Sequence, residues 1–461
     1  MHTCFKIDSD QLHDECGVFG IYNNDNLDTA TLPYFALHAL QHRGQESAGL
    51  AASNGRAVTH YKGPGYVTDV FSPELLARFR KQRIVIGHVR YSTSGSKLPT
   101  NAQPIVARYS NGFISVAHNG SLINSRQLSS YLTKKGALLQ TDLDSELIIH
   151  LISNNMSLGI DKALEISMDK LKGAYAVVMM TKNELIGIRD PHGIRPLCIG
   201  KIGDSYVLAS ESCAFDAINA EFVRDAKPGE IIIIDENGLR SFISGPDRPS
   251  HLCMFEFVYF ARTDSIMDRV SVYKARVEAG ALLAQTDPVD ADMVAGVPDS
   301  AIPAALGYSQ KSGIPYGEAL VKNRYIGRTF IEPTQSKRKT SVKMKLAALK
   351  ANVEGKRIVL IDDSIVRGTT SARIVDMLRG AGATEVHLRI SSPPVKHPCF
   401  YGIDTPDKKQ LINFEHSASE ICQMVGADSL AYLPINKLEQ SLSGCCLGFC
   451  DACFSGNYPV R

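Results

Sequence analysis

Short apolar runs separated by turn-forming residues dominate the first half of the chain. Runs rich in valine, isoleucine and tyrosine, bounded by Gly, Asn or Asp, occupy residues 18–22, 84–88, 114–117, 175–180, 206–209 and 231–234. This composition predicts a β-strand in each run. Apolar residues recur at helical spacing in residues 143–152 and 162–171, which predicts two helices. Strands and helices mixed in this order predict an α+β layered domain.

After residue 250 the hydrophobic pattern changes to strands that alternate with helices. The turn-rich sequence GPDRPS at residues 245–250 marks the expected boundary. Beyond it the pattern predicts helices at 273–285, 302–310 and 369–381, and strands at 293–297, 357–361 and 386–390. Such alternation is typical of an α/β domain with a parallel sheet. We therefore expect a leader at 1–15, a first domain at 16–250 and a second domain at 251–461.

One predicted strand ends in a pattern that suits phosphate binding. Residues 358–361 are continuously apolar, Asp362 and Asp363 follow, and the next helix opens with Arg367, Gly368, Thr369, Thr370 and Ser371. Backbone N–H groups and hydroxyls at a helix N-terminus bind anions, and glycine allows close approach. Two adjacent carboxylates would repel a phosphate unless they hold a cation, for which Mg²⁺ is suited, or bind sugar hydroxyls. The segment therefore predicts a site for a phosphorylated sugar rather than an ordinary capped helix.

Composition and charge narrow the class of protein. The 461 residues are 44% hydrophobic and 21% charged, with a formal net charge of +2. This balance gives no basic surface for nucleic acid or for an anionic membrane. No apolar run approaches the ~20 residues of a membrane helix, and residues 1–15 lack the pattern of a secretory signal. We expect a soluble cytoplasmic protein.

Cys16 is a candidate nucleophile because it follows a short polar leader and begins an apolar strand. A thiol reacts as the thiolate and needs a base. Cleavage after Glu15 would supply one, since a free α-amine has a pKa of about 8. Alone, Cys16 also fits a buried strand cysteine.

Three further segments favour the interpretation of Cys16 as a nucleophile over that of a buried cysteine. Arg90 can pair with the α-carboxylate of an amino acid, and Asp144 can hold its α-amine. Asn119 and Gly120 offer an amide and a backbone N–H to an oxyanion. Each also has a plain structural interpretation: a surface arginine, a helix N-cap or an Asn-Gly turn.

In order and spacing, residues 16–240 resemble the class II glutamine amidotransferases. The resemblance is carried by Cys16 and by the segments 41–49, 88–93, 118–120, 142–146 and 189–197. It implies the αββα sandwich of N-terminal nucleophile hydrolases. It also implies that Cys16 attacks the side-chain amide of glutamine.

The second half resembles the type I phosphoribosyltransferases. In that family the two acids contact the ribose hydroxyls and the Gly-Thr-Thr-Ser stretch holds the 5-phosphate. The segment 297–300 resembles the pyrophosphate loop, which places Ser300 near the metal. The segment 322–330 resembles the flexible flap, whose expected cations toward the tetra-anionic donor are Lys322, Arg324, Arg328 and Lys343.

Together the two halves resemble the amidotransferase family in which a class II glutaminase is fused to a type I phosphoribosyltransferase. The resemblance implies that ammonia from glutamine crosses to phosphoribosyl pyrophosphate (PRPP) and yields 5-phosphoribosylamine, the first committed step of purine synthesis. It also implies a homotetramer inhibited by AMP and GMP. Two alternatives fit less well. A phosphoribosyl-fold regulator would carry a basic helix-turn-helix, and the hexosamine-forming amidotransferase would carry sugar-isomerase domains.

The eleven cysteines do not suggest disulfides in a reducing compartment. Four of them match the [4Fe–4S] ligands of one branch of this family: Cys253, Cys399, Cys450 and Cys453. Four thiolates also suit zinc, so the chemistry of the residues leaves both metals open. Cys445 and Cys446 match no ligand position and are interpreted as packing residues. A cluster here would be structural and would fasten the C-terminal tail.

Overall fold

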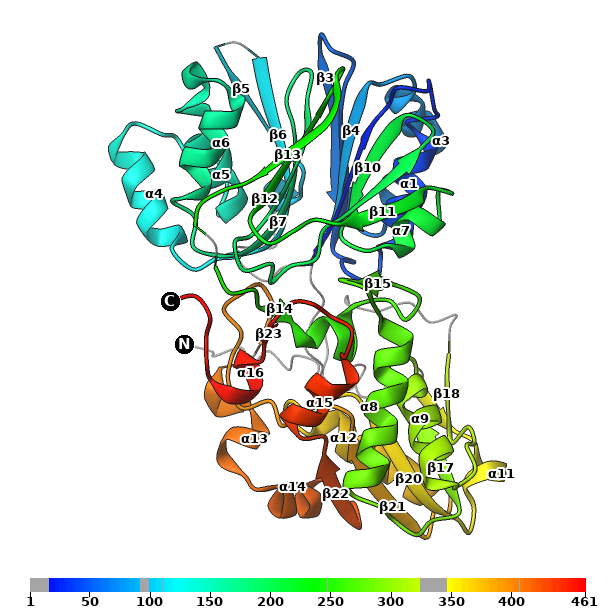
Figure 1. The fold of residues 1–461 in the computed structure, drawn as a ribbon. Coiled ribbons are helices and arrows are strands. Elements are labelled where there is room, and N and C mark those ends of the chain that lie inside the picture. Colours follow the sequence, from blue (N-terminus) through cyan, green and yellow to red (C-terminus); the bar gives the residue numbers. More distant parts are fainter. Residues whose placement is uncertain (1–15, 92–98, 111, 247, 324–345, 406) are drawn as a thin grey trace, which may run out of the picture.

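The computed structural model describes residues 16–91, 99–110, 112–246, 248–323, 346–405 and 407–461. Figure 1 shows two layered bodies, a β-rich one above and an α/β one below. Two expected parts of the chain lie outside the described residues, the leader at 1–15 and most of the flap with Arg324, Arg328 and Lys343.

Two antiparallel sheets form the centre of the upper body in the described chain. The first has the order β11 (Glu221–Asp225), β9 (Cys198–Ile202), β10 (Ser205–Ala209), β1 (Gly17–Tyr22), β4 (Ile84–Arg90), β2 (Ser47–Ser53) and β3 (Val58–Pro64). The second has the order β13 (Gly238–Ile243), β12 (Glu230–Asp235), β8 (Leu185–Arg189), β7 (Gly173–Met180), β6 (Gly112–Leu122) and β5 (Ile105–Tyr109). Buried apolar side chains of β1, β4, β6, β7 and β12 fill the space between the sheets.

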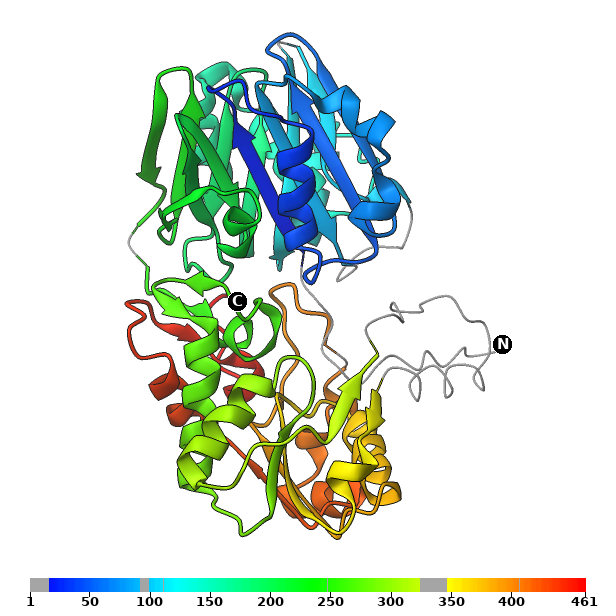
Figure 2. The same ribbon diagram turned by 90° about the vertical axis from the view of Figure 1, so that its right-hand side faces the viewer.

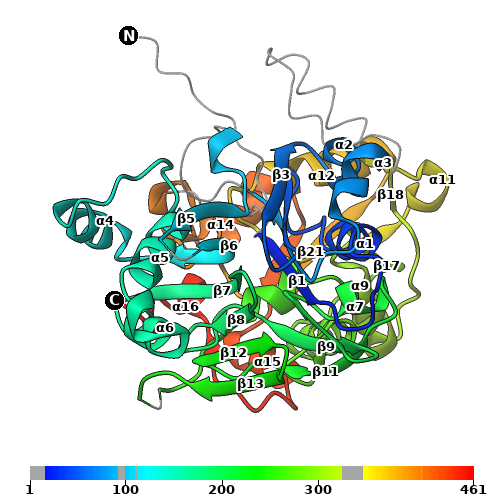
Figure 3. The ribbon, with the colours of Figure 1, turned by 90° about the horizontal axis from the view of Figure 1, so that it is seen from above.

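Helices cover the outer face of each sheet, as Figure 3 shows from above. Those beside the first sheet are α1 (Thr31–Ala39), α2 (Val67–Val70), α3 (Pro73–Leu76) and α7 (Cys213–Asp216). Those beside the second sheet are α4 (Ser125–Lys134), α5 (Asp144–Ser153) and α6 (Ile160–Met168). The αββα sandwich expected of the first half is therefore confirmed.

Helix α6 ends three residues earlier than the pattern predicts. The side chain of Asn124 donates to the carbonyl of Lys170 at 2.9 Å and accepts from the N–H of Lys172 at 3.1 Å. These bonds hold the backbone in a turn that leads into β7. Leu171 is still buried, which explains why it extended the apolar pattern of the helix.

A parallel sheet forms the centre of the lower body. Its order is β17 (Met293–Gly296), β20 (Arg357–Asp362), β21 (Glu385–Ile390) and β22 (Ser429–Tyr432). Helices lie on both faces, as Figure 2 shows, which explains why β20 is buried along its length. The longer ones are α8 (Val272–Thr286), α9 (Ile302–Ser312), α12 (Thr369–Gly380), α14 (Ala418–Val425) and α15 (Ile435–Ser441). The predicted α/β fold is confirmed.

Small elements complete the lower body and its border with the upper one. They are β15 (Ile266–Met267), β16 (Val270–Ser271), β18 (Leu320–Lys322), β19 (Leu346–Ala348), α11 (Lys350–Val353), α13 (Ile412–Glu415), α16 (Ala452–Ser455) and a π-helical turn at Glu256–Phe260. Strand β14 (Leu252–Cys253) pairs in parallel with β23 (Phe449–Cys450), so the C-terminal tail returns to the border (Figure 1). In the described part of the chain, no helix has both the length and the apolar character to cross a membrane.

Candidate active sites

Cys16 lies at the start of β1, the central strand of the first sheet. Gly17 pairs with Val89 on β4, and this register brings Cys16 beside Arg90. The thiol is buried, and its Sγ lies 3.6 Å from the carbonyl oxygen of Tyr91. Burial raises the pKa of the Cys16 thiol, while the charges of Arg90 and Arg43 oppose that rise. The candidate nucleophile and the candidate carboxylate-binding arginine therefore lie at the same end of two paired strands.

Asn119 and Gly120 lie on β6, across the sandwich from β4. A hydrogen bond between His88 Nε2 and the carbonyl of His118, 3.0 Å long, joins the two strands. Asn119 is 1% exposed, and neither atom of its side-chain amide has a hydrogen-bond partner among the described residues. Gly120 has a φ of 138°, and a Cβ there would lie 2.0 Å from the carbonyl oxygen of Ala174. The chain therefore supplies an unpaired buried amide beside a position that accepts only glycine.

Asp144 is the first residue of α5 and reaches back toward β6. Its Oδ2 accepts from the N–H of Leu122 at 2.8 Å, and its Oδ1 lies 3.4 Å from Nδ1 of His118. Burial acts to raise the pKa of Asp144, but His118 and the backbone N–H of Leu122 hold it below its ordinary value. The lowered pKa favours the ionised carboxylate, which is the form that pairs with a cationic group.

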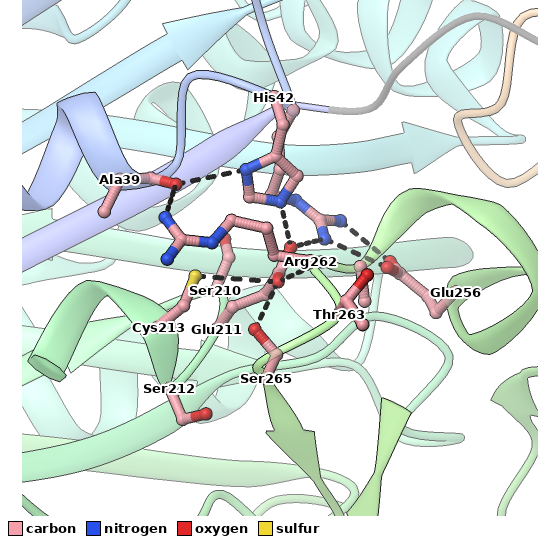
Figure 4. A network of polar contacts seen from close by, with 12 residues as sticks. Ala39, His42, Ser210, Glu211, Ser212, Cys213, Glu256, Arg262, Thr263 and Ser265 are labelled. Carbon is pink, nitrogen blue, oxygen red and sulfur yellow. Dashed lines mark hydrogen bonds and ion pairs between the residues drawn. The ribbon is translucent and has the colours of Figure 1, made fainter. Parts of the chain in front are cut away.

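Arg43 is a site residue that motif analysis left without a role. It follows α1, within the segment 41–49, and its Nε donates to the carbonyl oxygen of Cys16 at 3.1 Å. The rest of its guanidinium pairs with Glu211 and Glu256. Figure 4 shows His42, Arg262 and Ser265 gathered around Glu211. In the sequence, only the position of Arg43 within the segment 41–49 pointed to the site. Only the closeness of Glu256 to Cys253 along the chain pointed to a functional region.

The paired acids lie at the carboxyl end of β20, as predicted for a ligand site of a parallel sheet. Both are buried, and Asp363 accepts from the hydroxyls of Ser300 at 2.5 Å and Ser364 at 2.6 Å. The structure thus brings Ser300 and Asp363 together from separate loops. Burial raises the pKa of Asp363, against these hydrogen bonds and the charge of Arg276. Hydroxyl and carboxylate oxygens are ligands that suit Mg²⁺.

Helix α12 begins at Thr369, directly after the acids. Gly368 precedes it with a φ of 81°, and a Cβ there would lie 2.7 Å from Cδ1 of Ile412. Ser371 is buried in the first turn, Thr370 is half-buried and Thr369 is exposed. Arg367 donates to the side chain of Gln410 at 3.1 Å. The turn therefore presents N–H groups and hydroxyls at a helix N-terminus that follows the acids.

Lys322, the first cation of the expected flap, lies at the end of β18. Its Nζ forms an ion pair with Asp299 of the predicted pyrophosphate loop. A cation of the expected flap and an acid of the expected pyrophosphate loop therefore neutralise each other here. A bound anion would compete for Lys322.

The four cysteines assigned by resemblance gather at the border of the two bodies. Cys253 and Cys450 are directly paired in the β14–β23 ladder, Cys453 lies in α16 and Cys399 lies in a preceding loop. Burial raises the pKa of Cys450 to about 12, with Cys399 adding to the rise. Cys453 is likewise affected by Cys399 and Cys450. Across the described residues, no three His, Cys, Asp or Glu side chains form a ready metal site. The thiols are nevertheless neighbours from separate segments, which fits a shared ligand.

Comparison with known proteins places these features in one class. The family described as "Glutamine amidotransferase domain" matches residues 88–217, and that described as "Phosphoribosyl transferase domain" matches residues 278–392. A glutamine amidotransferase joined to a phosphoribosyltransferase is the class that the fold and the two sites define. The amidophosphoribosyltransferase of Bacillus subtilis (strain 168) is 48% identical over 457 residues, covering 98% of this chain and 95% of that protein. That of Archaeoglobus fulgidus is 49% identical, covering 96% and 98%. The chain belongs to the amidophosphoribosyltransferase family, which carries out glutamine-dependent amination of PRPP in purine biosynthesis.

Solved structures agree over the whole fold. Glutamine PRPP amidotransferase from B. subtilis, complexed with ADP and GMP, matches with a TM-score of 0.90 at 47% identity. The match covers 97% of this chain and 98% of that chain. A second structure, described as the allosteric regulatory enzyme of purine biosynthesis, matches with a TM-score of 0.91 at 48% identity, covering 97% and 96%.

Proposed function

We propose that Cys16 is the nucleophile of the glutaminase reaction. Its Sγ attacks the side-chain amide carbon of glutamine, the C–N bond breaks, and ammonia leaves with a proton from the site. Water then hydrolyses the thioester to glutamate and restores the thiol. The observation that supports this role is the position of Cys16 beside Arg90, with the unpaired amide of Asn119 across the sandwich.

The other residues of this site have separate tasks in the proposal. Arg90 pairs with the α-carboxylate of glutamine, and Asp144 holds its α-amine. Asn119 and the N–H of Gly120 stabilise the oxyanion that forms when the thiol attacks. Because Asn119 has no partner among the described residues, its amide needs no rearrangement to accept this task.

A free α-amine at Cys16 is the proposed base. Cleavage between Glu15 and Cys16 would create it, and an amine with a pKa of about 8 can take the thiol proton. Sequencing of the N-terminus of active enzyme tests this step. Active enzyme that still begins at Met1 would contradict it.

At the second site, we propose that the acids bind the donor. Members of this family use Mg²⁺ with PRPP. Ser300, Asp362 and Asp363 supply the oxygen atoms for that ion and for the ribose hydroxyls. The first turn of α12, with its neighbour Arg367, binds the 5-phosphate. Lys322, together with Arg324, Arg328 and Lys343, neutralises the pyrophosphate. Ammonia from the first site attacks C1 of the ribose, and pyrophosphate leaves with the electron pair of its bond.

A [4Fe–4S] cluster on Cys253, Cys399, Cys450 and Cys453 is the proposed cofactor at the border. The four-thiol donor set suits it, and it would supply a structural link between the tail and the start of the second half. Iron and sulfide should be present after anaerobic purification. Cys450→Ser should lose them and Cys446→Ser, an exposed cysteine outside the set, should keep them. Zinc, or no metal, in the anaerobic protein would refute the assignment.

We also propose a domain boundary, a class of inhibitors and an oligomeric state. The boundary between the two domains lies at residues 250–251, within a turn-rich segment. AMP and GMP are the proposed inhibitors, and the B. subtilis relative is complexed with ADP and GMP. The protein assembles as a homotetramer, which light scattering at several protein concentrations would test.

The central experiment separates the two half-reactions. Glutaminase activity is measured with and without PRPP, and phosphoribosylamine formation is measured with glutamine or with ammonia. Cys16→Ser should abolish the glutamine-dependent reaction and keep the ammonia-dependent one. A Cys16→Ser variant that still used glutamine would refute the proposed nucleophile.

A further inference from the structure

We propose that Glu256, in the phosphoribosyltransferase half, is a positioning residue for the Cys16 nucleophile in the glutaminase half and acts through Arg43. This inference rests on the proposed role of Cys16. It assigns a task in the first reaction to a residue of the second domain.

The contact between the two halves is a buried, two-pronged ion pair. Arg43 NH1 donates to Oε2 of Glu256 at 2.9 Å, and NH2 donates to Oε1 at 2.8 Å. The third guanidinium nitrogen, Nε, donates to the carbonyl oxygen of Cys16 at 3.1 Å. Both side chains are fully buried, at 0% exposure. Because a paired fork fixes the plane of the guanidinium, Glu256 fixes the direction in which Nε meets the Cys16 backbone.

A second carboxylate completes the charge balance around Arg43. Glu211 lies 2.5 Å from NH1 and is itself held by His42 at 2.8 Å and by the hydroxyl of Ser265 at 2.6 Å, as Figure 4 shows. Burial opposes the charge of Arg43, but Glu256 and Glu211 together keep its pKa above the ordinary value. Glu256 also lies 3.6 Å from NH1 of Arg195. The guanidinium of Arg43 therefore stays charged, and its orientation depends on both acids.

Glu256 is itself held rigidly from the side of the second domain. It begins the π-helical turn. The guanidinium of Arg276 donates to the carbonyls of Phe257 and Tyr259 in this turn at 2.7 and 3.1 Å, and to that of Ala261, which directly follows it, at 2.9 Å. Arg276 lies on α8, and its charge acts on Asp363 of the donor site. The turn that carries Glu256 is thus held by an arginine of α8 whose charge also acts on Asp363. Glu211 belongs to the glutaminase half, but it accepts from the backbone N–H of Arg262 at 2.9 Å and from the hydroxyl of Ser265 at 2.6 Å. Glu256 differs from Glu211 because its own backbone is part of the second domain.

The test compares two acid–arginine pairs in which both carboxylate oxygens are bound by the guanidinium, in the full-length enzyme. Glu256→Gln keeps the size of the side chain and removes its charge. Glu230→Gln is the matched control, because Glu230 is buried and pairs with Arg224 through both oxygens at 2.7 and 2.8 Å, away from Cys16. We expect Glu256→Gln to lower kcat/KM for glutamine about 100-fold, the scale of a small misplacement of reacting groups. Its ammonia-dependent synthesis should stay within about threefold, and Glu230→Gln should leave both activities within about twofold.

Two further measurements separate positioning from a general loss of structure. Alkylation of Cys16 by iodoacetamide is followed against pH, and the rate profile of Glu256→Gln should differ from that of Glu230→Gln. Glu256→Asp, which keeps the charge on a shorter side chain, should lose about tenfold in glutamine-dependent activity alone.

Equal loss of both activities in Glu256→Asp would overturn the inference, as would glutamine-dependent activity of Glu256→Gln equal to that of the control. The Cys16→Ser variant separates failure of the proposed nucleophile, Cys16, from failure of the proposed positioning residue, Glu256. If Cys16→Ser still hydrolyses glutamine, the nucleophile assignment fails. If Cys16→Ser is inactive with glutamine and Glu256→Gln is normal, only the positioning role fails.

Discussion

Replacing Gly402 by alanine should impair the glutaminase reaction from the other domain. Gly402 lies in the loop after Cys399 and has a φ of 108°, in the region that favours glycine. A Cβ built on Gly402 would lie 2.9 Å from the carbonyl carbon of Gly120 and 3.0 Å from its Cα. Gly120 is the proposed oxyanion donor. The substitution therefore pushes against the catalytic strand.

The size of the effect follows from these contacts. Ordinary van der Waals contact begins near 3.4 Å, so the two backbones must separate by about 0.5 Å. A displacement of 1 Å at a catalytic group can cost ~100-fold in rate, so half of it should cost about tenfold in kcat/KM for glutamine. The left-handed conformation adds about 1–2 kcal/mol of backbone strain for alanine.

Gly136→Ala is the control for that strain. Gly136 has a φ of 88°, and no described atom lies within 4 Å of a Cβ built there. Both variants should lose similar thermal stability, but only Gly402→Ala should lose glutamine-dependent activity relative to ammonia-dependent synthesis. Equal ratios of the two activities in both variants would show that the contact with Gly120 does not matter.

Three other substitutions test separate parts of the structure. Asn119→Ala should lower glutamine-dependent kcat ~100- to 1000-fold through loss of an oxyanion donor, without lowering the melting temperature, because the amide has no described partner. A clear loss of stability would contradict that account. Asp363→Asn should lower synthesis from both glutamine and ammonia more than about tenfold, through weaker metal binding, while Cys16 still hydrolyses glutamine. Unchanged dependence of synthesis on Mg²⁺ would count against it. Burial and the neighbouring Asp268 raise the pKa of Asp225 to about 7. Since its unfolded pKa is about 3.9, the stabilising protonated form is lost as pH rises from about 4 to 7. Thermal unfolding at pH 5 and 8 should show Asp225→Asn gaining stability over the native protein at pH 8, and no change in that difference would refute the shift.

The sequence determined most elements of the two halves and supplied the residues that are proposed to bind substrate. The continuous apolar run of β20 predicted a strand buried on both faces, and the acids at its end predicted a ligand site. Helix α6 was predicted too long because Leu171 is apolar and buried although it lies outside the helix. A pattern of apolar residues indicates which side chains are buried. It does not indicate where a helix ends when the turn after it also buries an apolar side chain.

Only the tertiary structure decided how the two sites are connected. Cys16, Arg90, Asn119 and Asp144 each had a plain structural interpretation alone, and they became candidates through the order and spacing of their motifs. The pairing of Arg43 with Glu256 spans 213 positions and joins residues on the two sides of the proposed domain boundary. No local pattern encodes such a contact, since burial of the two charges together becomes favourable only after both domains have folded. The sequence thus determined which groups are proposed to do the chemistry. The packing of one domain against the other decided what holds them in place.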